Sequence, residues 1–278
     1  MSYRSILVHA CQAGKARSRY RLAAAIARAE GAQLAGIAPS GMTELVYRCG
    51  AAAAIGSVDA GDLSFLAENA QRELAAFEAE AAHAGVAPVA GQLSDDSAAR
   101  ALPLAARCCD LLVIGQENSP DEVFADDHSL ARTVLVHAPC PVLVVPGVAT
   151  ADALPQLPLI AWDGSMEASR AVRAALPLLR RAGKATAITF PPEKFHTDDG
   201  KAGACLAAYL HCHGIDVALI ESAHAASVGH ALLSFARERS HDLIVMGCFG
   251  HSRFREIVLG GVTHTVLSAS TVPILMCH

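Results

Sequence analysis

The sequence predicts two tandem α/β domains, each built as a doubly wound sheet of five parallel strands. Three observations carry this prediction. The 278-residue chain is 53% hydrophobic but only 5% aromatic, a composition typical of small-residue helices packed on a buried sheet. Short apolar runs alternate with helical patterns along the chain. The second half of the sequence also repeats the first, so one domain plan is used twice.

The repeat is clearest in the second part of each half. The segments CDLLVIGQ (109–116) and HDLIVMGC (241–248) match closely. The later segments CPVLVVP and TVPILMC also correspond, and their prolines are the same number of positions apart as the first two segments. Asp110 and Asp242, Gly115 and Gly247, and Pro141 and Pro273 form pairs that are each 132 positions apart. A constant offset indicates a repeated structural unit of equal length here, which chance similarity explains poorly.

The beginnings of the two halves match less closely and set the domain limits. Pairing Ile6 with Leu159 gives an offset of 153, so the first half carries about 21 additional residues. The stretch 40–62 is the predicted insertion, a long loop with or without a short helix. It is either a lid or binding element or a plain crossover. The expected domains are 1–146 and 156–278, joined by a Pro/Ala-rich linker.

The elements of the second half follow in a regular order. Each strand is apolar on both faces and each is joined to the next by a helix, a pattern typical of a parallel sheet with helices on both sides. The expected strands are 157–162, 185–190, 215–222, 242–247 and 272–277, and the expected helices are 165–183, 200–214, 227–240 and 261–270. Right-handed crossovers place the carboxyl ends of all five strands along one edge, where such sheets bind ligands.

A glycine-bearing segment, MGCFGHSRFREIVLGGVTHTVL (246–267), follows the fourth strand of the second half. Its glycines are Gly247, Gly250, Gly260 and Gly261. Backbone N–H groups at a strand end and at a helix N-terminus form a natural phosphate site, and glycine lets the backbone approach an oxygen closely. The segment is neither a Walker A loop nor a GxGxxG loop. It predicts a phosphate cradle, to which Val262 would add an N–H and Thr263 a hydroxyl.

This spacing resembles the universal stress proteins, whose ATP-binding members carry G-x2-G-x9-G-[ST] before the last helix. The resemblance covers both halves and implies a tandem member with HUP/Rossmann-like domains related by a pseudo-two-fold axis. It also implies ATP, or ADP or AMP, with or without Mg²⁺, bound in the second domain. The residues that it assigns to adenine are Ala161, Trp162, Asp163 and Phe190, to the ribose side Met246 and Gly247, and to phosphate Gly250, Gly260, Gly261, Val262 and Thr263.

Three positions leave alternatives open. Gly261 stands where the family usually has Ser or Thr, so one hydroxyl contact is missing and Thr263 is the candidate to replace it. Trp162 is large for its place and either lines the base or packs into the core. His251 lies inside the loop, either on the phosphate side or on the surface.

The first half has lost the glycine pattern. The equivalents of the four glycines are Gly115, Asn118, His128 and Ser129, and five acidic residues lie between 117 and 127. Carboxylates repel phosphate, and the first strand is not followed by an Asp. We therefore expect no nucleotide in the first domain by this route. The resemblance also implies that segments 141–145 and 273–277 pair as antiparallel strands, which would join the domains and protect both apolar edges. A homodimer of whole chains is a further expectation.

Composition and motifs exclude several other functions. The net charge of −5 gives no basic surface for nucleic acid, and no apolar run reaches the ~18 residues that a membrane span needs. The chain starts directly in a strand-like run without a signal peptide, and its nine cysteines are expected to be reduced thiols. Both features predict a cytoplasmic protein. No paired Cys/His spacing indicates a metal site.

The sequence therefore predicts a stress-response or regulatory protein that binds an adenine nucleotide rather than a dedicated enzyme. No catalytic base stands beside a nucleophile, so ATP hydrolysis would be slow at most. Alternatives are a scaffold that binds no nucleotide, a slow ATP hydrolase, and a protein with a different ligand site in the first half, formed by residues 40–62 or 116–129.

Overall fold

The computed structural model describes residues 2–52, 60–86, 89–116, 130–148, 153–190, 201–222, 227–250 and 261–278. Strands β1–β5 precede residue 146 and strands β6–β10 follow residue 156, and we call these parts the first and second units. The first unit contains β1 (Ser5–His9), α1 (Ala13–Glu30), β2 (Gln33–Pro39), α2 (Met42–Ala52), α3 (Ala60–His83), β3 (Val89–Ser94), α4 (Ala98–Ala105), η1 (Ala106–Cys108), β4 (Leu111–Gly115), α5 (Leu130–His137) and β5 (Val142–Val145). The second contains β6 (Pro158–Ala161), α6 (Met166–Ala182), β7 (Lys184–Thr189), α7 (Lys201–Cys212), β8 (Asp216–Glu221), α8 (Val228–Glu238), β9 (Leu243–Gly247), α10 (Val262–Ala269) and β10 (Ile274–Cys277).

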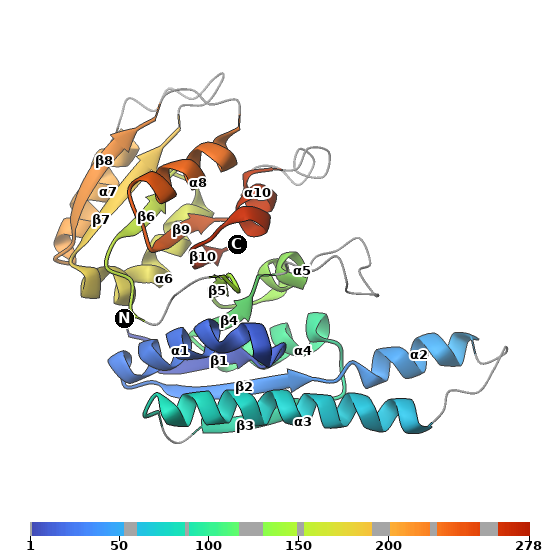
Figure 1. Cartoon of the computed structure of the whole chain (residues 1–278). Helices are drawn as coiled ribbons and strands as arrows, with labels where there is room; N and C mark the ends of the chain where they lie inside the picture. Colours follow the sequence, from blue (N-terminus) through green and yellow to red (C-terminus); the bar gives the residue numbers. More distant parts are fainter. Residues whose placement is uncertain are drawn as a thin grey trace.

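All ten strands form one sheet in the order β3-β2-β1-β4-β5-β10-β9-β6-β7-β8 (Figure 1). Within each unit the strands are parallel and follow the same doubly wound order. The two units meet where β5 and β10 pair antiparallel, with Leu275 opposite Leu143. The predicted fold class and the pairing through the last strands are thus confirmed.

The sheet register corrects the sequence alignment of the first strands by one position. Leu7 pairs with Leu112, and Leu159 pairs with Ile244, which is the equivalent of Leu112 at an offset of 132. Leu7 and Leu159 are therefore equivalent, so the offset is 152 rather than 153. The helix-ending glycines Gly31 and Gly183 have the same offset. The central residues of both β1 and β6 are apolar on both faces of the sheet, so hydrophobicity alone does not determine their register.

The predicted insertion at 40–62 is more helical than expected. It contains α2, of 11 residues, and the start of α3, whose 24 residues are twice the 12 of its counterpart α7. Figure 1 shows α2 and the adjoining end of α3 extending past the edge of the sheet. The Ala-rich composition that suggested a loop also has a high helix propensity, and here that propensity prevails.

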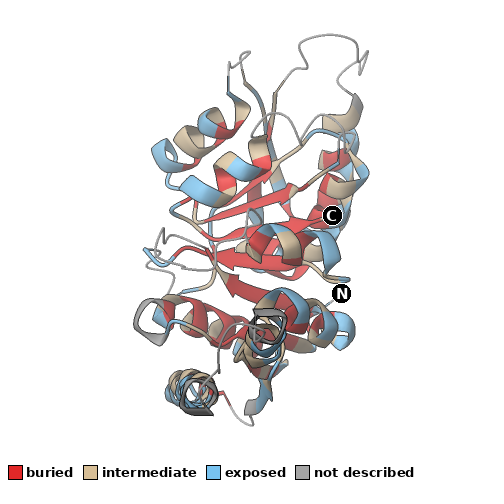
Figure 2. Cartoon of the chain, turned by 90° about the vertical axis from the view of Figure 1, so that its right-hand side faces the viewer, coloured by how far each residue is buried: buried red, intermediate tan, exposed pale blue. Residues whose placement is uncertain are grey.

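Helices cover both faces of the sheet and divide the core in two. One buried cluster joins the sheet to α1, α3, α6 and α7, and the other joins it to α4, α5, α8 and α10. Figure 2 shows the buried residues concentrated in the strands and on the sides of the helices that face them. Within the described ranges, no helix is long and apolar enough to cross a membrane, and the described cysteines carry no disulfide.

Hydrogen bonds outside the sheet also link the two units. The Tyr3 hydroxyl donates to the Ala174 carbonyl at 2.6 Å, and the Gln116 side-chain amide donates to the Leu267 carbonyl at 2.7 Å. Tyr3 is only 3% exposed, and this burial raises the pKa of its hydroxyl far above the ordinary value.

Tyr3→Phe should change how stability depends on alkaline pH. Because the folded pKa of Tyr3 is raised, its stabilisation is complete below the unfolded value of ~10 and is lost as the pH rises beyond it. The wild type should lose up to ~1.4 kcal/mol per pH unit there through Tyr3. At pH 7 the free energy of unfolding of the variant should be lower than that of the wild type by ~1 kcal/mol. Above pH 10 it should fall less steeply with pH than that of the wild type.

Urea titrations at pH 7, 10 and 11 measure this effect. Tyr47→Phe is the control, because Tyr47 is 79% exposed. This substitution should change neither the stability at pH 7 nor its slope at alkaline pH. Equal alkaline slopes in wild type and Tyr3→Phe would contradict the prediction.

Candidate functional site

Three neighbouring strands of the second unit bring the predicted nucleotide residues to one sheet edge. Strand β6 lies between β7 and β9 and is parallel to both. Their carboxyl ends therefore place Trp162, Phe190 and Gly247 along the same edge. The Trp162 N–H donates to the Ile188 carbonyl at 2.9 Å and continues the β6–β7 pairing past the strand end.

The Asp163-Gly164-Ser165 segment forms the turn that starts α6. The Asp163 carboxylate accepts a hydrogen bond from the Ser165 N–H at 2.9 Å, and the Ser165 hydroxyl caps α6 by accepting from the Ala168 N–H at 3.1 Å. Gly164 has a φ of 75°, a conformation that glycine adopts without steric cost. Asp163 is exposed, so its carboxylate lies on the surface of the edge.

The apolar site residues lie on opposite faces of the sheet. Ala161, Phe190 and Val262 are half-buried against the core beneath α8 and α10. Trp162 is half-buried against the core beneath α6, and its indole N–H is buried without a hydrogen-bond partner among the described residues. Met246 is 6% exposed, so its side chain belongs to the core and only its backbone borders the edge.

Gly247 and Gly250 make room for the first turn of α6. A Cβ on Gly247 would lie 2.5 Å from the Ala168 backbone nitrogen and 2.7 Å from the Glu167 carbonyl carbon. A Cβ on Gly250 would lie 2.5 Å from a Glu167 carboxylate oxygen. Gly247 is therefore required by helix–strand packing whether or not a ligand binds, and Glu167 is an acidic group at this edge that the sequence did not single out.

The N-terminus of α10 supplies backbone donors. Gly261 is the N-cap, with φ −67° and ψ 177°, and no side chain caps the helix at this position. The first N–H groups of a helix have no partner within the helix, and the helix dipole makes this end attractive to anions. The Thr263 side chain is 5% exposed, so the backbone is the better donor here. The predicted residues His251 and Gly260 lie outside the described residues.

The first unit contributes to this edge, which sequence reasoning missed. Phe249 has a φ of 58°, and the Arg132 guanidinium of α5 lies 5.8 Å from the centre of its ring. His278 lies edge-on to the same ring at 5.9 Å, and its Nδ1 is 3.3 Å from the Cys248 carbonyl oxygen. The antiparallel β5–β10 pair brings Arg132 here from the other unit, and no local motif signals that approach.

The equivalent edge of the first unit is built differently. The corrected register puts Cys11 in the place of Asp163. Arg19 is 4% exposed, and one of its terminal nitrogens donates to the Cys11 carbonyl at 2.5 Å. The other terminal nitrogen lies against Gly115. A guanidinium therefore fills the space beside the glycine that matches Gly247. The equivalents of the other three glycines, Asn118, His128 and Ser129, lie outside the described residues.

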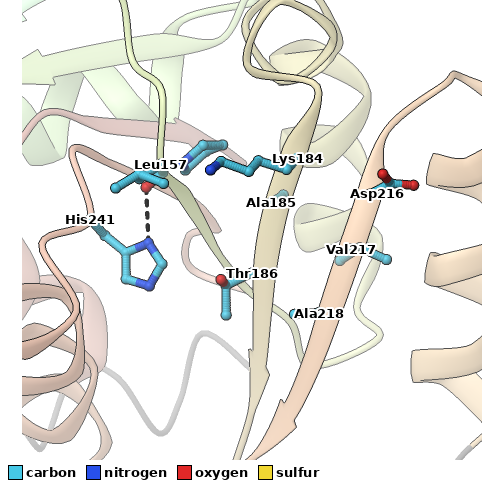
Figure 3. Close-up of a pocket in the computed structure, with 9 residues that line it drawn as sticks. Leu157, Lys184, Ala185, Thr186, Asp216, Val217, Ala218 and His241 are labelled. Carbon is cyan, nitrogen blue, oxygen red and sulfur yellow. Dashed lines mark hydrogen bonds between the residues drawn. The ribbon is translucent and has the colours of Figure 1, made fainter.

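A pocket of about 380 Å³ lies at the opposite edge of the second unit's sheet (Figure 3). Its walls come from the amino ends of β6, β7 and β8 and from His241. The His241 ring nitrogen Nδ1 is 2.9 Å from the Leu157 carbonyl oxygen, and the ring stacks on Phe235 at 5.7 Å. This pocket is therefore separate from the edge that carries the glycines. Among the described residues no group of His, Cys, Asp and Glu is arranged to hold a metal ion.

Comparison with known proteins identifies the family of the second unit. Residues 159–278 match the model of the universal stress protein family. The chain is 39% identical over 51 residues to universal stress protein Slr1230 of Synechocystis and 43% identical over 47 residues to universal stress protein YxiE of Bacillus subtilis. Each match covers 17% of this chain. The matched segments span 18% of the length of Slr1230 and 32% of the length of YxiE.

The fold similarity extends over both units. A crystal structure of a universal stress protein from Archaeoglobus fulgidus aligns with a TM-score of 0.71 and 17% identity, covering 98% of this chain and 95% of that one. At this identity the likeness shows the fold alone. Residues 159–278 therefore belong to the universal stress protein family, and both units of the chain share the fold of a member of that family.

Proposed function

We propose that this protein is a nucleotide-responsive stress or regulatory protein whose second unit binds ATP, ADP or AMP. The observation that carries the proposal is the meeting of four segments at one sheet edge. These are the Trp162-Asp163 turn, Phe190, the Gly247–Gly250 segment and the N-terminus of α10, whose N-cap residue is Gly261. Aromatic surface beside backbone donors is the combination that a purine nucleotide requires.

Each group has a distinct task in this proposal. Phe190 and Trp162 offer apolar surface to adenine from the two faces of the sheet at this edge, and the Trp162 indole N–H is a donor in need of an acceptor. The N–H groups of Val262 and Thr263 hold the phosphates. The Glu167 carboxylate beside Gly250 suits ribose hydroxyls, because a carboxylate accepts hydrogen bonds from hydroxyls and repels phosphate.

The remaining parts of the proposal follow from this site. The first unit acts as a structural partner, because Arg19 and Cys11 replace the corresponding features of the second unit. The domains of this proposal are 1–146 and 156–278, and Mg²⁺ would bind together with the phosphates. The protein would act in the cytoplasm, where two chains would associate as a homodimer. A scaffold that binds no nucleotide is the second candidate, favoured by the buried Met246 and Thr263 side chains.

Val262→Pro should weaken nucleotide binding about tenfold or more. Val262 is the first residue of α10, where proline is tolerated because that N–H has no helical partner. The extended Gly261 backbone also suits a following proline. The substitution therefore removes one donor, and a hydrogen bond to a charged group contributes about 1.5–3 kcal/mol.

Calorimetric titration with ATP, ADP and AMP measures the effect, and Val262→Ala is the matched control. Alanine loses the packing of the valine but keeps the N–H, so its affinity should stay near that of the wild type. Equal affinities of the proline and alanine variants would show that the Val262 N–H does not bind the nucleotide.

The nucleotide content of the freshly purified protein decides between the two candidates. Denaturation followed by anion exchange should release about one adenine nucleotide per chain. Two per chain would show that the first unit also binds. If no nucleotide is released, and millimolar ATP with Mg²⁺ gives no thermal shift, the scaffold function is favoured.

A further inference from the structure

Two thiols of the first unit face each other at the amino ends of neighbouring strands. Cys109 directly follows η1, two residues before β4, and Cys140 lies two residues before β5. Strands β4 and β5 are parallel neighbours that pair from Leu112 and Val142 onward. The two sulfur atoms are 3.6 Å apart, although 31 positions separate the residues in the sequence. Nothing in the sequence spacing indicated this pair.

The two thiols are not equivalent. The hydrogen bond from Cys140 lowers the pKa of Cys109, and the same interaction, with burial, raises the pKa of Cys140. Cys109 therefore loses its proton more readily than Cys140, and the thiolate is the form that attacks an oxidant. Both residues are half-buried, so a small oxidant can reach them while a larger thiol reagent is hindered.

The backbone also suits a covalent link. Neighbouring strands lie ~4.8 Å apart, and a disulfide joins residues whose Cα atoms are usually ~4.4–6.8 Å apart. Cys109 and Cys140 lie just before the amino ends of such neighbouring strands, and their sulfur atoms are already 3.6 Å apart, so bond formation requires only a short further approach of the two sulfur atoms. The closed segment would contain β4 and α5, the helix that carries Arg132 to the edge of the second unit.

We propose that Cys109 and Cys140 are a peroxide-sensitive pair that forms a reversible disulfide. The Cys109 thiolate attacks one oxygen of hydrogen peroxide, the O–O bond breaks, and the departing hydroxide takes up a proton to leave as water. The Cys140 sulfur then attacks the resulting sulfenic acid, giving up its proton as the S–O bond breaks, and a second water leaves. Two thiols and one peroxide thus yield one disulfide and two waters, and a dithiol reductant reverses the change.

The test treats the full chain with one equivalent of hydrogen peroxide and maps its peptides without reduction. The expected product is a link between the peptides that contain Cys109 and Cys140, two mass units lighter than the two peptides together. Dithiothreitol should remove the link and restore the two titratable thiols. This outcome does not depend on nucleotide binding.

Matched variants assign the link to one pair. Cys108→Ser removes the exposed neighbour of Cys109 and should leave the disulfide yield unchanged. Cys140→Ser should abolish the link and leave a sulfenic acid on Cys109, which dimedone traps. A link through Cys108, or no cross-linked peptide in the wild type, would overturn the proposal. Because the wild-type mapping gives an answer without any variant, a folding defect in Cys140→Ser does not leave the question open.

Discussion

Gly247→Ala should destabilise the protein by about 1–3 kcal/mol even in the absence of any ligand. The added methyl group would lie 2.5 Å from the Ala168 nitrogen and 2.7 Å from the Glu167 carbonyl carbon. Both are backbone atoms at the start of α6, so no side-chain rotation can relieve the contact. Either β9 or the first turn of α6 must move, and interiors packed at crystal density resist such shifts.

This prediction separates two roles for the same glycine. If Gly247 served only the approach of the nucleotide, the ligand-free variant would be as stable as the wild type. A packing role predicts a lower midpoint in a urea titration of ligand-free protein. It also predicts weaker nucleotide binding, because a shift of β9 displaces Gly250 and the Glu167 carboxylate that lies against it.

Gly203→Ala is the matched control. Gly203 lies in the first turn of α7, and its added Cβ would make an ordinary contact of 3.6 Å with Leu219. Alanine is favoured over glycine in a helix by at most ~1 kcal/mol, so this variant should be at least as stable as the wild type. A loss of stability in both variants would show that the effect at Gly247 is not specific to its backbone contacts.

Phe77→Ala should cost about 3–5 kcal/mol, the largest effect expected for a single substitution in the first unit. Phe77 lies on α3, is fully buried, and meets the Tyr20 ring edge-on at 5.4 Å. Its ring also fills the space above Gly36 on β2. Truncation would leave a cavity between α1, α3 and the sheet that the rigid strands cannot close.

Phe65→Ala provides a control on the same helix, because Phe65 is 59% exposed and its loss should change stability by less than ~0.5 kcal/mol. Circular dichroism and intrinsic fluorescence together report on both units. Because Trp162 lies in the second unit, its fluorescence should follow the same transition as the helical signal if the ten-stranded sheet unfolds as one body. A separate, earlier transition for the helical signal alone would show that the first unit melts independently.

Much of the fold could be predicted from the sequence, because period and composition are local properties. Short apolar runs such as LIVM (243–246) favour a strand buried on both faces, and the 132-residue offset indicated two units of one kind. The antiparallel pairing of the last strands was implied by the family resemblance, and the structure shows it. The register of β1 against β6 could not be predicted, since a strand that is apolar on both faces fits two registers equally well.

The candidate site was predicted as a set of segments, and the structure determines how each side chain is used. Sequence spacing was enough to bring Trp162, Phe190 and Gly247 to one edge, because parallel strands align their carboxyl ends. Burial of Met246 and Thr263 depends on helices packed from elsewhere in the chain. The contact of Gly247 with α6 likewise depends on how closely that helix approaches β9.

The sequence by itself determined the alternation of strands and helices, the two units and the glycine segment. Each of these features depends on the pattern of residues that are close together in the sequence. Only the tertiary structure decided which distant groups meet. The pairs Arg132 and Phe249, Cys109 and Cys140, and Arg19 and Gly115 are brought together by strand order and by the β5–β10 junction. Contacts of this kind depend on the relative placement of whole elements, and no local pattern of residues encodes that placement.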